Sequence, residues 1–80
     1  MADQTSDSST MSRDELGEYL RDLAEELEGE GEANVAVGNK TVTLNPGAEI
    51  DCDVEVDERS PMVGSDVEEI VVDMSWQPQG

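Results

Sequence analysis

The sequence predicts an α+β domain in which one N-terminal helix packs on one face of a four-stranded antiparallel meander sheet. Two observations lead to this prediction. Residues 11–29 carry apolar side chains at helical spacing, and residues 33–77 contain alternating runs of apolar and polar side chains. Short turn signals separate the runs, so each strand is expected to pair with the next strand along the chain.

The predicted helix, residues 12–28, has clear signals at both ends. Ser12 and Glu15 have the spacing of a capping box, in which each side chain accepts a hydrogen bond from an otherwise unpaired backbone N–H. Gly29 is expected to end the helix in the left-handed conformation. The apolar side chains between them share one face: Leu16, Tyr19, Leu20, Leu23, Ala24 and Leu27. A lone helix of this length is marginal in water, so this face needs a partner.

Residues 33–44 are predicted to form a β-hairpin. Gly38-Asn39 is a two-residue turn signal between two alternating runs. The expected pairs are Val37 with Lys40, Val35 with Val42, and Ala33 with Leu44. The apolar residues of both runs then lie on one face, so the turn and the hydrophobic pattern agree on the register.

The remaining two strands are longer. After the turn Asn45-Pro46-Gly47, residues 48–57 alternate between acidic and apolar side chains. Residues 58–66 are expected to form a loop, and the last strand is expected at about 67–77. The helix is predicted to cover the face that carries Val35, Val42, Ile50, Val54, Val72 and Trp76.

The opposite, acidic face is the candidate interaction face. Its residues are Asp51, Asp53, Glu55, Asp57 and, from the last strand, Asp73. The spacing of Asp51, Asp53 and Glu55 also matches the first three ligand positions of a calcium-binding loop. Val56, however, stands where that loop requires glycine, and the run alternates as a strand. We therefore interpret this run as a solvated strand face.

Composition argues against several classes of function. The 80 residues include 21 acids and four bases, which gives a net charge of −17, with one Cys and no His. This charge opposes direct binding to nucleic acid. Without His, the usual general base and the commonest transition-metal ligand are missing, and no apolar run is long enough to span a membrane. We expect no enzymatic activity, no cofactor and no bound metal.

The residues from Met11 to Pro78 resemble the Amphi-Trp domain family. The resemblance rests on the helix S-R-D-E-L-x-x-Y-L-R-D-L-A-E-E-L-E, on short Val-rich strands, and on the closing amphipathic strand from Ile70 to Trp76, which ends V-V-D-M-S-W. Members of this family are small proteins, many of them from haloarchaea, without an established activity. The resemblance implies the fold and a salt-rich cytoplasm, and it implies no site residues.

Together these features predict a disordered tail at residues 1–10 and a single domain at 11–78. The expected function is that of a small non-enzymatic interaction or accessory module of a halophile, located in the cytoplasm, with a protein partner that the sequence does not identify. The alternative is an acidic nucleic-acid mimic that binds a basic partner protein. A monomer is favoured over a homodimer, although Val71, Met62 and Val63 offer a modest apolar patch.

Overall fold

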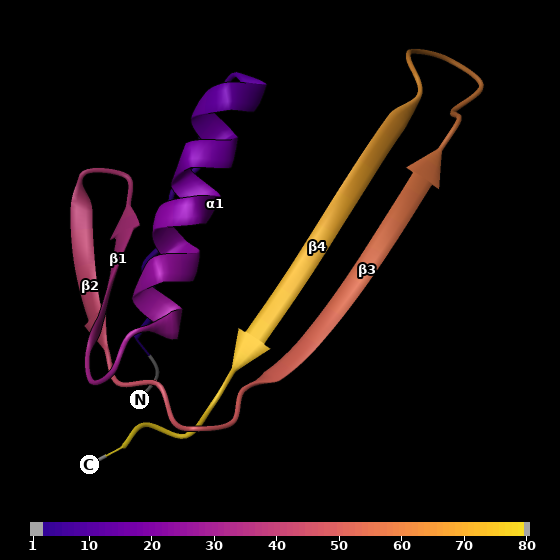
Figure 1. Cartoon of the computed structure of the whole chain (residues 1–80). Coiled ribbons are helices and arrows are strands. Elements are labelled where there is room, and N and C mark those ends of the chain that lie inside the picture. Colours follow the sequence, from indigo (N-terminus) through magenta and orange to yellow (C-terminus); the bar gives the residue numbers. More distant parts are fainter. Residues whose placement is uncertain (1–2, 80) are drawn as a thin grey trace. The chain divides into compact units, whose positions relative to one another are not determined.

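The computed structural model describes residues 3–79 and confirms the α+β class. Its elements are α1 (Arg13–Glu28), β1 (Ala33–Val37), β2 (Lys40–Leu44), β3 (Asp51–Arg59) and β4 (Val67–Ser75) (Figure 1). β1 pairs with β2 and β3 pairs with β4, both antiparallel, so the strands form two sheets of two strands each.

The predicted single four-stranded meander is not confirmed, because within residues 3–79 the pairing stops after β2 and begins again at β3. The six residues between these strands include Pro46, which has no N–H to donate to a sheet. The chain divides here into two compact units. One contains the described residues up to Pro46 together with Pro78 and Gln79, and the other is Gly47–Gln77.

The start of α1 is the predicted capping box. The backbone N–H of Glu15 donates to Ser12 Oγ at 3.1 Å, and the backbone N–H of Ser12 donates to Glu15 Oε1 at 3.2 Å. The helix ends before Gly29, as predicted, but the predicted left-handed conformation is wrong: Gly29 is extended, and its N–H donates to the carbonyl oxygen of Glu25. The left-handed residue is Gly31, three residues beyond Glu28, with a φ of 84° that glycine adopts without steric cost.

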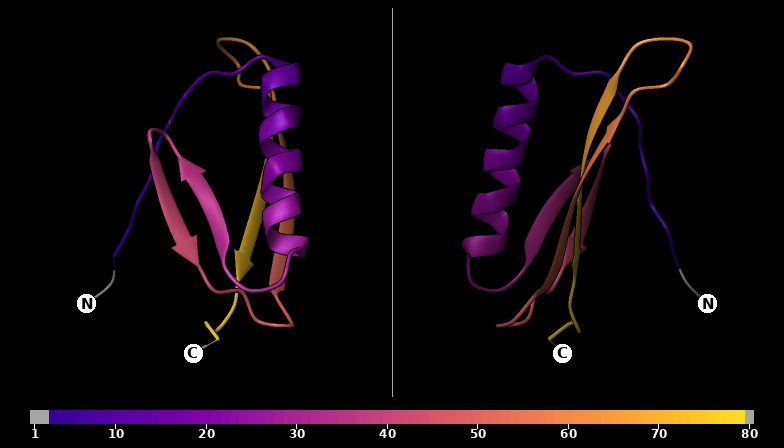
Figure 2. Two further views of the ribbon diagram at one scale, coloured as in Figure 1. Left: turned by 60° about the vertical axis from the view of Figure 1, so that its left-hand side comes forward. Right: turned by 90° about the vertical axis from the view of Figure 1, so that its right-hand side faces the viewer.

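α1 packs against β1, as Figures 1 and 2 show. The Tyr19 hydroxyl donates to the carbonyl oxygen of Ala36 at 2.7 Å, and the backbone N–H of Asn34 donates to Glu26 Oε1 at 2.7 Å. Tyr19, Leu23 and Leu27 are half-buried, whereas Leu16 and Leu20 on the far side of the apolar stripe are about half exposed. The hairpin therefore covers only part of the helical face that the sequence predicts.

The register of β1 with β2 is the predicted one. Val35 lies opposite Val42, and Ala33, which is completely buried, lies opposite Leu44. Gly38 has a φ of 64°, as the first central residue of a type II′ turn requires. Local turn chemistry and the alternation of side chains were sufficient to place this hairpin.

β3 and β4 form a long two-stranded ribbon closed by the loop at residues 60–66 (Figure 2). β3 begins three residues later and ends two residues later than the predicted strand at 48–57. β4 ends at Ser75, so Trp76 lies just outside it. Ile50 and Trp76, which adjoin the Asp51–Ser75 pair at the open end of the ribbon, are half-buried, and every residue within the two strands is exposed.

Of the predicted tail, residues 3–10 form neither helix nor strand, and residues 1–2 lie outside the described residues.

The capping box gives a direct test of the helix start. We expect Ser12→Ala to lower the free energy of unfolding by about 1 kcal/mol, because the N–H of Glu15 loses its acceptor. The measurement is urea unfolding in molar KCl, followed by far-UV circular dichroism. Ser6→Ala, in the segment before the helix, is the control, and equal effects of the two substitutions would contradict the role of the cap.

Candidate functional site

The register of β3 with β4 places all five predicted site residues on one face of the ribbon. Asp53 lies opposite Asp73, and Asp57 lies opposite Glu69. Opposed residues share a face, and residues two apart along a strand return to it. We define the acidic face as Asp51, Asp53, Glu55, Asp57, Glu69 and Asp73.

Glu69 is a member of this face that the sequence-based site did not include. It stands four residues before Asp73, so period-two alternation places both on the same side of the strand. The same alternation places Val71 on this face, opposite Glu55. The signal for Glu69 was thus present in the sequence, whereas its position opposite Asp57 required the register.

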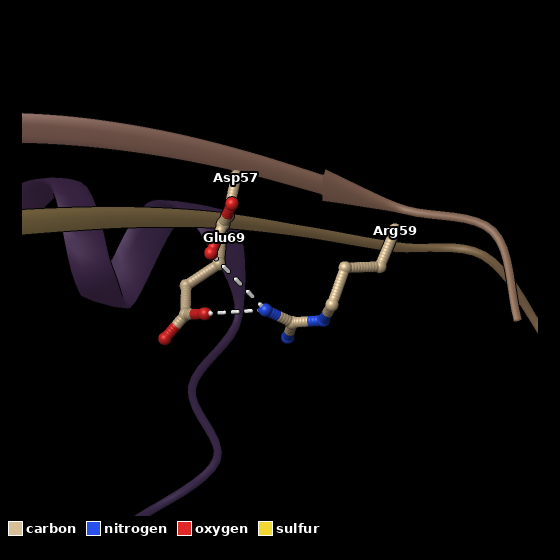
Figure 3. Close-up of polar contacts among 3 residues, drawn as sticks. All are labelled: Asp57, Arg59 and Glu69. Atoms are coloured by element: carbon tan, nitrogen blue, oxygen red, sulfur yellow. Dashed lines mark hydrogen bonds and ion pairs between the residues drawn. The ribbon is translucent and has the colours of Figure 1, made fainter.

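Arg59 supplies a positive charge at one end of the acidic face. Its Nη1 lies 3.0 Å from Glu69 Oε1 and 3.4 Å from Asp57 Oδ2 (Figure 3). All three side chains are about half exposed, so solvent screens these ion pairs and each contributes little to stability. Their main effect is to offset the repulsion between Asp57 and Glu69. Arg59 had been expected in the loop, but the structure shows it as the last residue of β3.

Asp53 and Asp73 have no such compensation. They are directly opposed across the two strands, and like charges in this position destabilise a sheet. The ion pairs among the described residues all involve Arg59, which lies six residue pairs closer to the loop. The middle of the acidic face is therefore a site of uncompensated repulsion.

The other side of the ribbon is apolar. We define the apolar face as Cys52, Val54, Val56, Ile70, Val72 and Met74. Val54 is 66% exposed, Val56 63% and Ile70 73%. These side chains were expected to be core residues, but the pairing of β3 with β4 alone does not bury them. The ribbon displays two chemically opposite surfaces at once.

The acidic face and the apolar face carry carboxylates, apolar groups and one thiol. Cys52 is free and exposed, and the residue paired with it is Met74. Within residues 3–79, no group of three or more Cys, Asp or Glu side chains has the arrangement of a metal site. The acidic face offers hydrogen-bond acceptors and negative charge, and the apolar face offers hydrophobic contact.

A second feature is a groove between α1 and β1 with a volume of about 310 Å³. Leu23, Val35 and the Tyr19 ring form its apolar wall, and Asp22 and Glu25 add carboxylates. The hydrogen bonds from Tyr19 to Ala36 and from Asn34 to Glu26 join its two sides.

α1, the helix that the structure describes, is too short and too polar to cross a membrane.

Comparison with known proteins agrees with the family resemblance seen in the sequence. The family model of the Amphi-Trp domain matches residues 2–80, which include α1 and both hairpins. No curated protein and no solved structure shows significant similarity to the chain. The chain belongs to the Amphi-Trp domain family.

Proposed function

We propose that this domain is a small non-enzymatic interaction or accessory module of a halophile, and that it acts in a salt-rich cytoplasm. The observation that carries the proposal is the β3–β4 ribbon, whose charged face and apolar face are both exposed along nine residue pairs. Such a surface binds a protein partner without any reactive group. The lack of His in the sequence supports a role that does not depend on acid–base chemistry.

The charge of the chain supports the salt-rich setting. Successive acids on one face of β3 lie about 7 Å apart, and each such pair repels by roughly 0.6 kcal/mol in water. Asp53 and Asp73 are closer, at about 5 Å across the strands. A small domain is stable by only ~5 kcal/mol, so this repulsion is a substantial part of the balance. At about 1 M salt the Debye length falls to ~3 Å, which removes most of it.

One observation favours a second candidate, an acidic nucleic-acid mimic that binds a basic partner protein. The acidic face has six carboxylates between the Asp51–Ser75 pair and the Asp57–Glu69 pair, a length of about 20 Å at ~3.4 Å per residue. That is one charge per ~3.4 Å, similar to a single strand of B-DNA. A basic groove that follows a nucleic-acid backbone would meet a comparable row of negative charges here.

The two candidates differ in how binding depends on salt. Tagged domain is used to capture proteins from a haloarchaeal lysate twice, once in molar KCl and once after dilution to low salt, and each captured partner is then tested in isolation. For an interaction module we expect the complex to persist in molar KCl, because apolar burial strengthens with salting-out conditions. For a mimic we expect a complex that forms only at low salt, weakens linearly on a log–log salt plot, and competes with duplex DNA. A domain that binds no protein at either salt concentration contradicts both candidates.

Matched charge variants identify the face that is used. The triple variant Asp51→Asn, Asp53→Asn, Asp73→Asn removes three charges from the acidic face. The control Asp3→Asn, Glu30→Gln, Glu32→Gln removes three charges outside the helix and strands. A mimic should lose at least tenfold in affinity at low salt with the first triple and much less with the control. Equal losses would show that net charge, and not the acidic face, determines binding.

The salt-rich setting makes a separate prediction about stability. We expect the unfolding midpoint temperature to rise with KCl in two phases. The first and steeper phase, due to screening, should be nearly complete by a few tenths molar, and a shallower phase should follow as apolar burial strengthens. Replacing Asp51, Asp53 and Glu55 together by Ser or Thr should flatten the first phase and leave the second nearly unchanged. An unchanged low-salt slope would show that the acidic face is not the source of the salt dependence.

A further inference from the structure

We infer that Tyr19 and Glu26 of α1 close the outer edge of β1, so that a strand of another chain cannot add to the first hairpin on that side. All the groups involved belong to the unit that contains α1, β1 and β2, and their role does not depend on the proposed function. Three features support it: the register of the hairpin, two hydrogen bonds, and a match in length between helix and strand.

β1 lies at the edge of a sheet of two strands. Among the described strands it pairs with β2 alone, and α1 lies on the side of β1 that faces away from β2 (Figures 1 and 2). The unpaired backbone groups of an edge strand are a template for pairing with another chain, which makes such edges sites of aggregation. The outward backbone groups of β1 therefore need protection.

The register of the hairpin identifies these outward groups. Along an antiparallel pair, residues that bond to the opposite strand alternate with residues whose backbone groups point away from it. Because the turn has two residues, Val35 bonds to β2, and its neighbours Asn34 and Ala36 direct their N–H and C=O groups outward. A strand added antiparallel to β1 would bond to both groups of each of these two residues.

Side chains of α1 occupy one outward group of each residue. Glu26 Oε1 accepts a hydrogen bond from the backbone N–H of Asn34 at 2.7 Å, and the Tyr19 hydroxyl donates to the carbonyl oxygen of Ala36 at 2.7 Å. Each residue pair that an added antiparallel strand would form thus lacks one of its two hydrogen bonds. A parallel strand would keep the bonds of a single residue, because the two occupied groups are the outermost ones.

The spacing of the two side chains fits the strand. Tyr19 and Glu26 are seven residues apart, which is about two turns, or about 10.5 Å along the helix axis. Asn34 and Ala36 are about 7 Å apart along β1, and the N–H of the first and the C=O of the second lie at the outer ends of this span. The helix thus places a carboxylate where the strand offers a donor and a hydroxyl where it offers an acceptor.

The first test measures association. The double variant Tyr19→Phe, Glu26→Ala frees both backbone groups, and Glu25→Ala removes the same charge from the next position of α1 as the control. Both are compared with the wild type by sedimentation velocity of the full chain in molar KCl, with a reductant because Cys52 is free and exposed. We expect the double variant to form larger species at concentrations at least tenfold below any at which the wild type or Glu25→Ala does, because the edge of β1 is then open. Equal association of the three proteins would overturn the inference.

Amide hydrogen exchange tests the bond to Glu26 directly. We expect the N–H of Asn34 to exchange at least tenfold faster in Glu26→Ala than in the wild type, because it loses its acceptor. Glu26→Gln, whose amide oxygen still accepts, should retain most of the protection, and the N–H of Val35 should change little in either variant. Equal acceleration at Asn34 and Val35 would show a general loosening of the hairpin and would contradict the specific role of Glu26.

Tyr19→Phe alone keeps the test decisive if the double variant does not fold. It removes only the hydroxyl oxygen and keeps the ring that forms the wall of the groove with Leu23 and Val35. In amide NMR spectra recorded over a concentration series in molar KCl, we expect the signals of Asn34 and Ala36 to shift with concentration in Tyr19→Phe and to stay fixed in the wild type. Fixed signals in the variant, or equal shifts in both proteins, would overturn the inference.

Discussion

The antiparallel register of β3 with β4 is the constraint on which the surface chemistry of this domain depends. Because the period of a strand is two residues, this register gathers six carboxylates on one side and six apolar side chains on the other. A slip of one residue would bring the acids of β3 beside the apolar residues of β4. Backbone pairing thus keeps the charged side chains and the apolar side chains on opposite faces of the ribbon. No buried residue in either strand supports this arrangement.

The unit that contains α1 and the first hairpin is held together differently. Its contacts are specific but few: Ala33 is buried, and two side-chain hydrogen bonds join the helix to β1. Part of the apolar stripe of the helix remains exposed at Leu16 and Leu20. Small domains bury a modest fraction of their surface, so each further apolar contact has a large effect on stability.

Salt acts on both faces of the β3–β4 ribbon. Screening weakens the repulsion between Asp53 and Asp73 and also the repulsion between whole chains that carry a net charge of −17. Salting-out conditions favour the burial of Val54, Val72 and their neighbours. Both effects act in the same direction, so a rise in salt concentration should stabilise the ribbon and favour burial of its apolar face. The acidic face offers its carboxylates to solvent or to a basic partner.

The sequence by itself determined the features that depend on local chemistry. The capping box at Ser12 and Glu15, the Gly38-Asn39 turn and the register of the first hairpin all follow from hydrogen bonds or alternation over a few residues. The same alternation placed five carboxylates on one face of the ribbon. Only the tertiary structure decided the features that depend on distant contacts. These are the division into two sheets and the side of the helical stripe that meets β1. They also include the pairing of Asp57 with Glu69 and the extension of β3 to Arg59. Periodicity specifies which residues share a face, but which surface covers that face depends on the packing of segments far apart in the chain.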